Sequence, residues 1–252
     1  MNQHALNTEI KAFIQQKDKV KGTYLAADKT YISKYGGAGG QGSKGASGEG
    51  LLYEFFTPDY ICELMWDLAY RYGYEPKGTV LEPSLGTGNF LKWAKDPSKC
   101  YGFEINPVSK RICEILYPEA KIYEGYFETA FLKAPRFTER LKDKLTWLEG
   151  YPFSLVIGNP PYGKYKNTYS SYFPKPKMHQ IELFFMYYSL KLLKPGGLLV
   201  FITGSNFLRN GISYQGEKME LEKLCDLIDA YRLPPVFSST KVPTDILVLK
   251  RK

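Results

Sequence analysis

Four consecutive residues of this chain, Asn159-Pro160-Pro161-Tyr162, carry functional groups that suit a planar amine. They follow segment 153–158, whose first five residues are expected to form a buried strand. Two prolines in succession fix two φ angles and remove two backbone donors, so the loop is stiff and its carbonyls are free to face a ligand. The Asn159 side-chain oxygen and the Pro160 carbonyl can then accept both hydrogens of an NH2 group, while Tyr162 offers a flat face to a base. A proline-stiffened turn that closes an ordinary strand would explain either proline, but not the whole tetrapeptide.

A glycine-containing loop upstream supplies a second set of groups. Residues 79–81 are expected to form a short strand with Glu82 at its end, and Gly86 and Gly88 permit a tight turn before a helix that should open at 90–93. The loop is not GxGxxG and no lysine follows it to make a phosphate loop, which disfavours a dinucleotide or a nucleoside triphosphate. An acidic residue beside a glycine turn suits a ligand with an ammonium group and a nucleoside, and S-adenosylmethionine is such a ligand.

Glu104 stands at the tip of the next expected strand, 18 residues beyond Gly86. In doubly wound nucleotide sites an acidic residue at that tip holds the ribose diol through charge-assisted hydrogen bonds. The sequence therefore indicates Glu104 as a ribose ligand, with an exposed loop carboxylate as the alternative.

Two further stretches have the composition of a nucleic-acid contact. In residues 164–177, lysines that include Lys164 and Lys166 alternate with aromatic rings, which offers cations to phosphates and rings to bases. Phe237 begins the loop of an expected final hairpin and could serve as an aromatic plate. The alternatives are that residues 164–177 form an ordinary solvated loop and that Phe237 packs as a hydrophobic side chain without a ligand.

The elements that must position these groups form an alternating pattern of strands and helices. Thr57 is a candidate N-cap, with Pro58 at the first helical position. Residues 181–192 read as a strongly apolar helix, residues 198–205 as a fully buried strand, and the last third of the chain as two strands around a loop. The pattern predicts a doubly wound α/β sheet closed by an antiparallel hairpin.

Composition narrows the class of protein further. The 252 residues are 44% apolar, enough for one large α/β domain, and the formal net charge of +8 favours an anionic partner. No stretch resembles a signal peptide or a membrane span, so the expected location is the cytoplasm. Four scattered cysteines without a CxxC pair and only two histidines argue against a zinc site and a disulfide framework.

The chain is expected to divide near Leu51. Residues 1–50 should hold one weakly amphipathic helix followed by a glycine-rich run, 36–50, that cannot pack a core and should be a mobile loop or linker. Residues 51–252 should form the catalytic domain. No separate target recognition domain is apparent in the sequence.

Several segments together resemble a known family. From Leu51 onward, about four fifths of the chain, the sequence resembles the gamma class of S-adenosylmethionine-dependent DNA adenine-N6 methyltransferases. The matching segments occur in the order of that class: Phe56-Thr57-Pro58, VLEPSLGTGNF, GFEINP, IGNPPYG, LKPGGLLVFI and AYRLPPVF. The resemblance implies a seven-stranded Rossmann-like sheet whose last strand is antiparallel.

The resemblance also implies a role for particular residues. The catalytic residues would be Asn159, Pro160 and Tyr162. The cofactor would be bound by Phe56, Thr57, Glu82, Ser84, Gly86, Gly88, Asn89, Phe90, Glu104, Ile105, Phe127 and Asn159. The flipped adenine and the DNA would be contacted by Pro161, Tyr162, Lys164, Lys166 and Phe237. No metal is implied.

One position departs from the family pattern, and two other activities stay open. Tyr126 stands where the family commonly has an aspartate that binds the cofactor's adenine amine, which leaves that contact to the backbone or to stacking by Phe127. The same tetrapeptide occurs in methyltransferases of release-factor glutamine and of ribosomal RNA, although the Phe-Thr-Pro segment and the terminal hairpin fit the DNA enzymes better. A nucleic-acid-binding module without catalysis is the third reading.

Family members usually carry a target recognition domain after the catalytic one. A specificity subunit or further chain would supply it here, and the ending Lys-Arg-Lys resembles a boundary inside longer methylase-helicase proteins.

Overall fold

The computed structural model describes residues 2–36, 39–44, 51–54, 56–131, 150, 152–164, 169–173, 175–208, 214–236 and 243–252, with the backbone alone for 39–44, 51–54 and 170. The predicted substrate contacts of Lys166 and Phe237 lie outside these residues, and so does the segment 135–149, whose charged sequence predicts a helix.

A single large sheet organises the described part of the chain. Its seven strands are β3 (Val80–Glu82), β4 (Cys100–Glu104), β5 (Lys121–Glu124), β6 (Phe153–Gly158), β7 (Leu193–Gly204), β8 (Cys225–Arg232) and β9 (Thr244–Arg251). They lie in the order β5-β4-β3-β6-β7-β9-β8. The first five are mutually parallel, and β9 runs antiparallel to both β7 and β8. The predicted seven-stranded doubly wound sheet with an antiparallel last strand is confirmed.

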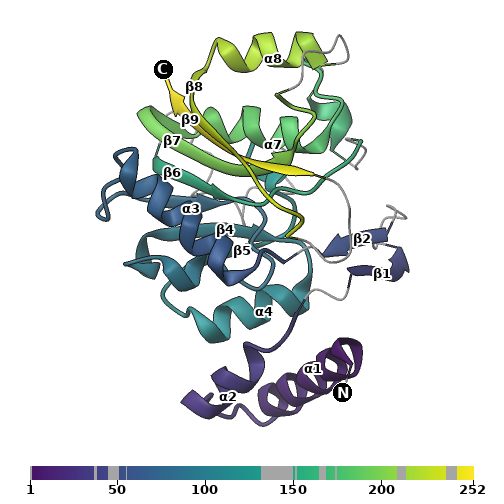
Figure 1. Ribbon diagram of the computed structural model, residues 1–252. Coiled ribbons are helices and arrows are strands. Elements are labelled where there is room, and N and C mark those ends of the chain that lie inside the picture. The colour runs from purple at the N-terminus through teal and green to yellow at the C-terminus, as the bar shows by residue number, and fades with distance from the viewer. Residues whose placement is uncertain are drawn as a thin grey trace.

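Helices cover both faces of the sheet (Figure 1). On one face, α3 (Asp59–Arg71) shares a hydrophobic cluster with Cys113 of α4 (Pro107–Leu116) and with Val200 and Ile202 of β7. On the other face, α7 (Ile181–Leu190) packs on Phe201. Successive side chains of β7 therefore enter opposite layers, as expected for a strand buried on both sides. Helix α8 (Gln215–Glu222) contacts α7.

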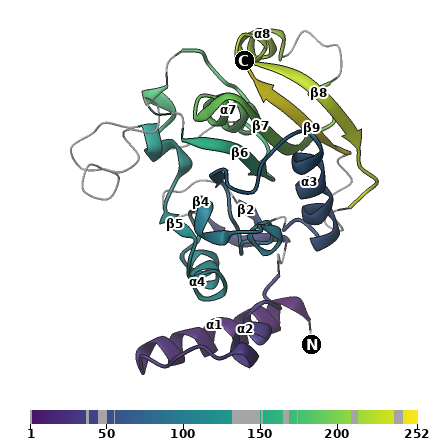
Figure 2. The same cartoon turned by 90° about the vertical axis from the view of Figure 1, so that its left-hand side faces the viewer.

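Two N-terminal helices pack beside α4. Helix α1 (Gln3–Lys19) was expected, whereas α2 (Ala26–Ile32) was not predicted. Their isoleucines form a separate buried cluster with two isoleucines of α4, and Arg111 of α4 donates to Asp18 at 2.7 Å. Both views show α1 and α2 lying together below α4 (Figures 1 and 2). Residues before Leu51 thus form a small hydrophobic core together with α4.

The glycine-rich run is partly ordered as a strand. Within it, β1 (Gly39–Lys44) pairs antiparallel with β2 (Leu51–Glu54). Residues 39–44 are therefore a strand and not a loop, because backbone pairing with a neighbouring strand does not require side chains that pack a core.

Two local predictions on the site side also need correction. Thr57 does not cap α3, because Pro58 holds an extended backbone, the helix begins at Asp59, and no side chain caps it. The helix expected from Phe90 is only a 3₁₀ turn, η1 (Leu91–Trp93), since Asp96 and Pro97 end any continuation within one turn. Further 3₁₀ turns are η2 (Pro97–Lys99), η3 (Phe127–Phe131) and η5 (Ser170–Tyr172).

Candidate active site

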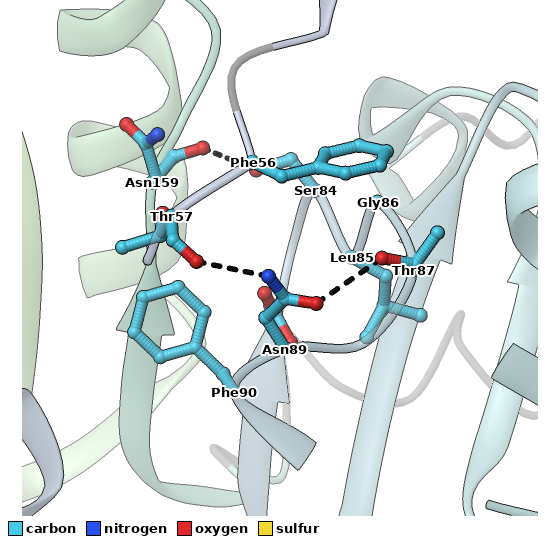
Figure 3. Close-up of a pocket in the computed structure, with 10 residues that line it drawn as sticks. Phe56, Thr57, Ser84, Leu85, Gly86, Thr87, Asn89, Phe90 and Asn159 are labelled. Carbon is cyan, nitrogen blue, oxygen red and sulfur yellow. Dashed lines mark hydrogen bonds between the residues drawn. The ribbon is translucent and has the colours of Figure 1, made fainter. Parts of the chain in front are cut away.

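A pocket opens at the carboxyl edge of the sheet, where the adjacent parallel strands β3 and β6 end. Its free volume, including the part open to solvent, is about 270 Å³. It is lined by Phe56, Thr57, Glu82, Ser84, Leu85, Gly86, Thr87, Asn89, Phe90 and Asn159. Figure 3 shows Asn159 and Phe56 at the top of the view and Asn89 and Phe90 below them. The carboxyl edge is where open α/β sheets bind ligands.

The glycine turn is held from behind by Glu104. Gly86 has a φ of +55°, a left-handed conformation that a glycine adopts without strain. Its N–H donates to Glu104 Oε2 at 2.7 Å, and the N–H of Asn106 donates to Glu104 Oε1 at 2.6 Å. The Cys113 thiol donates to the Gly86 carbonyl at 3.3 Å. Strand β4 and helix α4 therefore fix the turn through its backbone.

Residues before α3 form the opposite wall. The Phe56 ring lies so close to Gly86 that a Cβ added there would come within 3.0 Å of it. The Thr57 carbonyl accepts from Asn89 Nδ2 at 2.9 Å, and Asn89 Oδ1 accepts from the Thr87 hydroxyl at 3.1 Å. These bonds, drawn in Figure 3, tie the segment before α3 to the glycine loop.

Glu82 places a carboxyl group at the floor of the pocket. It is 2% exposed, and its Oε2 is a buried atom that no hydrogen bond joins to the described residues. Burial, and then the neighbouring Glu104 carboxylate, raise the pKa of Glu82 well above its usual range. A ligand cation beside Glu82 would offset both effects and favour the charged form.

The Asn159 corner lies on the β6 side of the same pocket. The Ser84 hydroxyl donates to the Asn159 carbonyl at 3.1 Å, which fixes the backbone of the corner to the glycine loop. The Tyr162 hydroxyl donates to Asn159 Oδ1 at 2.5 Å, and the Ile202 carbonyl oxygen lies 3.4 Å from the same hydroxyl oxygen. Burial, followed by the Glu182 carboxylate, raises the pKa of Tyr162, so the hydroxyl keeps its proton and stays a donor.

The end of the tetrapeptide loop is attached to the start of α7. The N–H of Ile181 donates to the Gly163 carbonyl at 2.8 Å, and the Gly163 N–H donates to Glu182 Oε2 at 3.3 Å. The backbone of Lys164 bridges to Gln180, and the Lys164 side chain is exposed. The segment Pro160 to Tyr162 therefore spans two fixed points, with Pro160 buried and Pro161 exposed.

Most of the predicted cofactor residues gather around the pocket. The lining contains Phe56, Thr57, Glu82, Ser84, Gly86, Asn89, Phe90 and Asn159, and Glu104 supports the turn from behind. Sequence reasoning missed Leu85 and Thr87, whose only signal was their place inside the glycine loop.

Other predicted residues lie apart from the lining. Phe127 is 1% exposed and packs against Phe103 and Phe185 in the core. Ile105 is partly exposed, and Gly88, with a φ of +80°, faces Cys113 rather than the pocket. Tyr126 makes an edge contact with Tyr169, with ring centroids 5.5 Å apart.

Two negative findings apply to the described residues alone. Within them, no group of three or more His, Cys, Asp or Glu side chains could hold a metal ion. None of the described helices is long and apolar enough to cross a membrane.

Solved structures with low sequence identity share the fold. A modification subunit of a putative type I restriction enzyme from Vibrio vulnificus YJ016 superposes with a TM-score of 0.63 at 19% identity, over 79% of this chain and 44% of that one. A putative class I S-adenosylmethionine-dependent methyltransferase from Listeria monocytogenes gives 0.58 at 18% identity, over 78% and 60%. The fold is therefore that of class I methyltransferases.

Proteins related in sequence are much longer than this chain. Defense against restriction protein B of Escherichia phage P1 is 29% identical over 223 residues, which cover 88% of this chain and 9% of that protein. Type II methyltransferase M.TthHB8I of Thermus thermophilus is 28% identical over 176 residues, covering 60% of this chain and 34% of that protein. The chain thus corresponds to a minor part of each of these relatives.

A family match covers the part of the chain that runs from β4 to the end of β8 and leaves out β3 and β9. Residues 98–237 match the family described as Eco57I restriction-modification methylase. That segment is more than half of the 252 residues and includes both Glu104 and the Asn159 corner. The chain belongs to the Eco57I restriction-modification methylase family.

Proposed function

We propose that this chain is the catalytic part of a DNA methyltransferase that transfers a methyl group from S-adenosylmethionine to the exocyclic amine of adenine. One observation carries the proposal: a single pocket unites Asn159 with the glycine turn and the buried Glu82. Family membership supports DNA as the substrate.

The residues around the glycine turn fit S-adenosylmethionine. Glu82 offers a buried oxygen that no described donor satisfies, which suits a cationic ligand. Gly86 lets a ligand approach the backbone without a Cβ, and Glu104 would hold the ribose while it keeps the turn in place. When bound, the cofactor supplies an electrophilic methyl group on a sulfonium.

The Asn159 corner would hold the target amine. An adenine amine is a poor nucleophile because its lone pair is delocalised into the ring. Asn159 Oδ1 and the Pro160 carbonyl would each accept one N–H hydrogen, which localises the lone pair on nitrogen and aligns it for attack. One of these hydrogens leaves as a proton once the nitrogen is methylated.

A paired adenine cannot reach this corner inside a duplex. It must be rotated out of the stack, at a cost of a few kcal/mol that stacking and phosphate contacts offset. Tyr162, whose hydroxyl donates to Asn159 Oδ1 beside this corner, would offer the face of its ring to the extruded base.

The test is methylation of three substrates in parallel. The chain would be incubated with methyl-labelled S-adenosylmethionine and either DNA, a purified release factor or ribosomal RNA. The proposal expects label in DNA alone. Label only in the release factor or the RNA would replace DNA as the substrate, and a chain that binds no S-adenosylmethionine would point to a non-catalytic nucleic-acid-binding module.

Selection of a particular DNA sequence would require more than the described residues. The solved relative from Vibrio vulnificus is named as a subunit of a type I restriction enzyme, and the sequence relatives are far longer than this chain. We infer that a further domain or subunit selects the target sequence.

A further inference from the structure

At the end of β8, an exposed arginine donates a hydrogen bond to a buried aspartate of the neighbouring strand β9. Arg232 and Asp245 are directly opposite each other on β8 and β9, and Arg232 Nε donates to Asp245 Oδ1. The Asp245 side chain is 2% exposed, whereas that of Arg232 is 59% exposed. The Ser205 hydroxyl also reaches Asp245 Oδ1, at 3.4 Å. The anion is therefore inside the fold and the cation projects from it.

This pair lies on the same edge of the sheet as the Asn159 corner. Gly158 is paired with Phe201, and two residues later on β7 Thr203 is paired with Asp245. Three strand spacings, roughly 14 Å across the sheet, and two residues along the strands, roughly 7 Å, separate the position of Gly158 from that of Arg232. Along one DNA strand a phosphate follows every ~3.4 Å of helix axis, so a span of this size covers roughly four nucleotides. A strand that delivers a base to Asn159 would thus carry phosphates within reach of Arg232.

The guanidinium is pre-oriented for an external anion. A guanidinium has five N–H donors in a planar fork, and only the Nε donor is used by Asp245. Among the described residues, no acceptor receives a hydrogen bond from its two terminal nitrogens. A planar, bidentate donor suits a phosphodiester, and the carboxylate reduces the conformational entropy that the side chain would lose on binding.

We propose that Arg232, held by Asp245, binds a backbone phosphate of the DNA strand whose base enters the Asn159 pocket. The inference rests on the proposed function, because it assumes a nucleic-acid substrate. It assigns Arg232 to DNA binding and Asp245 to positioning, and it gives neither residue a part in methyl transfer or cofactor binding.

The test measures affinity for a labelled random-sequence duplex over a range of salt concentrations. The full chain would be compared with Arg232→Gln, Arg232→Lys and a control, Lys223→Gln. Lys223 is 64% exposed, forms an ion pair with Glu220, and lies next to the opposite end of β8. S-adenosylmethionine affinity, measured by calorimetry, would verify that each variant is folded.

The expected result separates Arg232 from the control. Arg232→Gln should weaken duplex binding about tenfold and reduce the slope of log affinity against log salt by about 0.9, the value for one lost phosphate contact. Arg232→Lys should keep the slope and lose part of the affinity, because it keeps the charge without the fork. Lys223→Gln should change neither quantity.

Two results would overturn the inference. If the wild-type chain binds duplex and Arg232→Gln keeps its full affinity and salt slope, Arg232 merely neutralises Asp245 while the proposed function stands. If the wild-type chain shows no salt-dependent affinity for DNA, both the inference and the proposed function fail.

Discussion

The two sides of the pocket are held in different ways. On the β3–β4 side, the carboxylate of Glu104 accepts backbone N–H groups of Gly86 and Asn106. On the β6 side, the Tyr162 hydroxyl occupies Asn159 Oδ1. In the proposed function, the cofactor side keeps these backbone contacts when it is occupied, whereas on the second side a base amine shares Asn159 Oδ1 with the Tyr162 hydroxyl or replaces it. We therefore expect the cofactor side to be pre-organised and the hydrogen bonding of the target side to change when a base enters.

The two sides also differ in charge: the first contains the buried carboxyl group of Glu82, and the second contains the neutral side chains of Asn159 and Tyr162. Glu82 lacks a partner for one buried oxygen among the described residues, so a cationic ligand adds an interaction there. The Tyr162 hydroxyl already donates to Asn159 Oδ1, so an amine at that oxygen adds to a neutral hydrogen bond or replaces it. We expect cofactor affinity to depend on pH and target affinity to depend on the tyrosine hydroxyl.

The largest effect is expected from Asn159→Ala. The substitution removes the acceptor for the target amine and should reduce methylation by about 100- to 1,000-fold, the cost of losing one pre-organised polar group at a reacting centre. S-adenosylmethionine affinity should change little, because the alanine keeps the backbone carbonyl that accepts from Ser84. Initial methylation rates and calorimetry check the two parts, and near-normal methylation would remove Asn159 from the mechanism.

Gly86→Ala tests the pre-organised side of the pocket. The alanine would be strained at a φ of +55°, and its Cβ would lie 3.0 Å from the Phe56 ring. We expect about tenfold weaker cofactor binding together with a stability loss of about 1–2 kcal/mol. Gly73→Ala is the matched control, because Gly73 also has a positive φ, +102°, but no atom lies within 4 Å of an added Cβ. The control should lose stability and keep cofactor affinity, and equal cofactor affinity in both variants would contradict the assignment.

Glu82 should make cofactor affinity depend on pH. Its pKa is raised in the free chain, so at a pH below that raised pKa a cationic ligand that favours the carboxylate should bind with release of a proton, and affinity should fall by up to about tenfold per unit as the pH drops further. The free energy of unfolding depends on pH in the opposite direction. The protonated Glu82 contributes to folding stability below the ordinary glutamate pKa of about 4.3, and this contribution is lost as the pH rises through the raised pKa.

Calorimetry in two buffers with different ionisation enthalpies measures this proton release. Glu82→Gln should abolish the release, and Glu63→Gln, on the exposed face of α3, should leave it intact. Proton uptake by the wild-type chain, or release that persists in Glu82→Gln, would show that another group titrates.

The smallest effect is expected from Tyr162→Phe. The phenylalanine keeps the ring for stacking and deletes the hydroxyl that donates to Asn159 Oδ1. The free chain then loses a hydrogen bond worth about 1 kcal/mol. Methylation should stay within about fivefold of wild type, and KM for DNA should fall. Tyr162→Ala, which loses the ring as well, should be far slower. A phenylalanine variant as slow as the alanine variant would mean that the hydroxyl itself is required.

The sequence predicted the parts of the site that depend on local pattern. The apolar strands, the left-handed glycine turn and an acidic residue at each strand tip follow from residue type and spacing, and the structure places Glu82, Gly86 and Asn159 in one pocket. The carboxyl ends of parallel strands meet at one edge, so the strand order brings these residues together.

The remaining features depend on tertiary contacts. The bond between Tyr162 and Asn159 requires one side-chain conformation, which spacing does not specify. Helix α2 has seven residues and a single buried side chain, Ile32, so its periodicity is too short to recognise. Thr57 was predicted to cap α3 with its side chain, but its backbone carbonyl makes the contact that matters here, by accepting from Asn89.

The most direct measurement is nucleoside mass spectrometry of DNA from cells that make this chain. N6-methyladenine should be present above the level of cells without it, and absent from cells that make Asn159→Ala at equal abundance. DNA in which cytosine carries the new methyl group, or N6-methyladenine at the same level in the Asn159→Ala cells, would contradict the account.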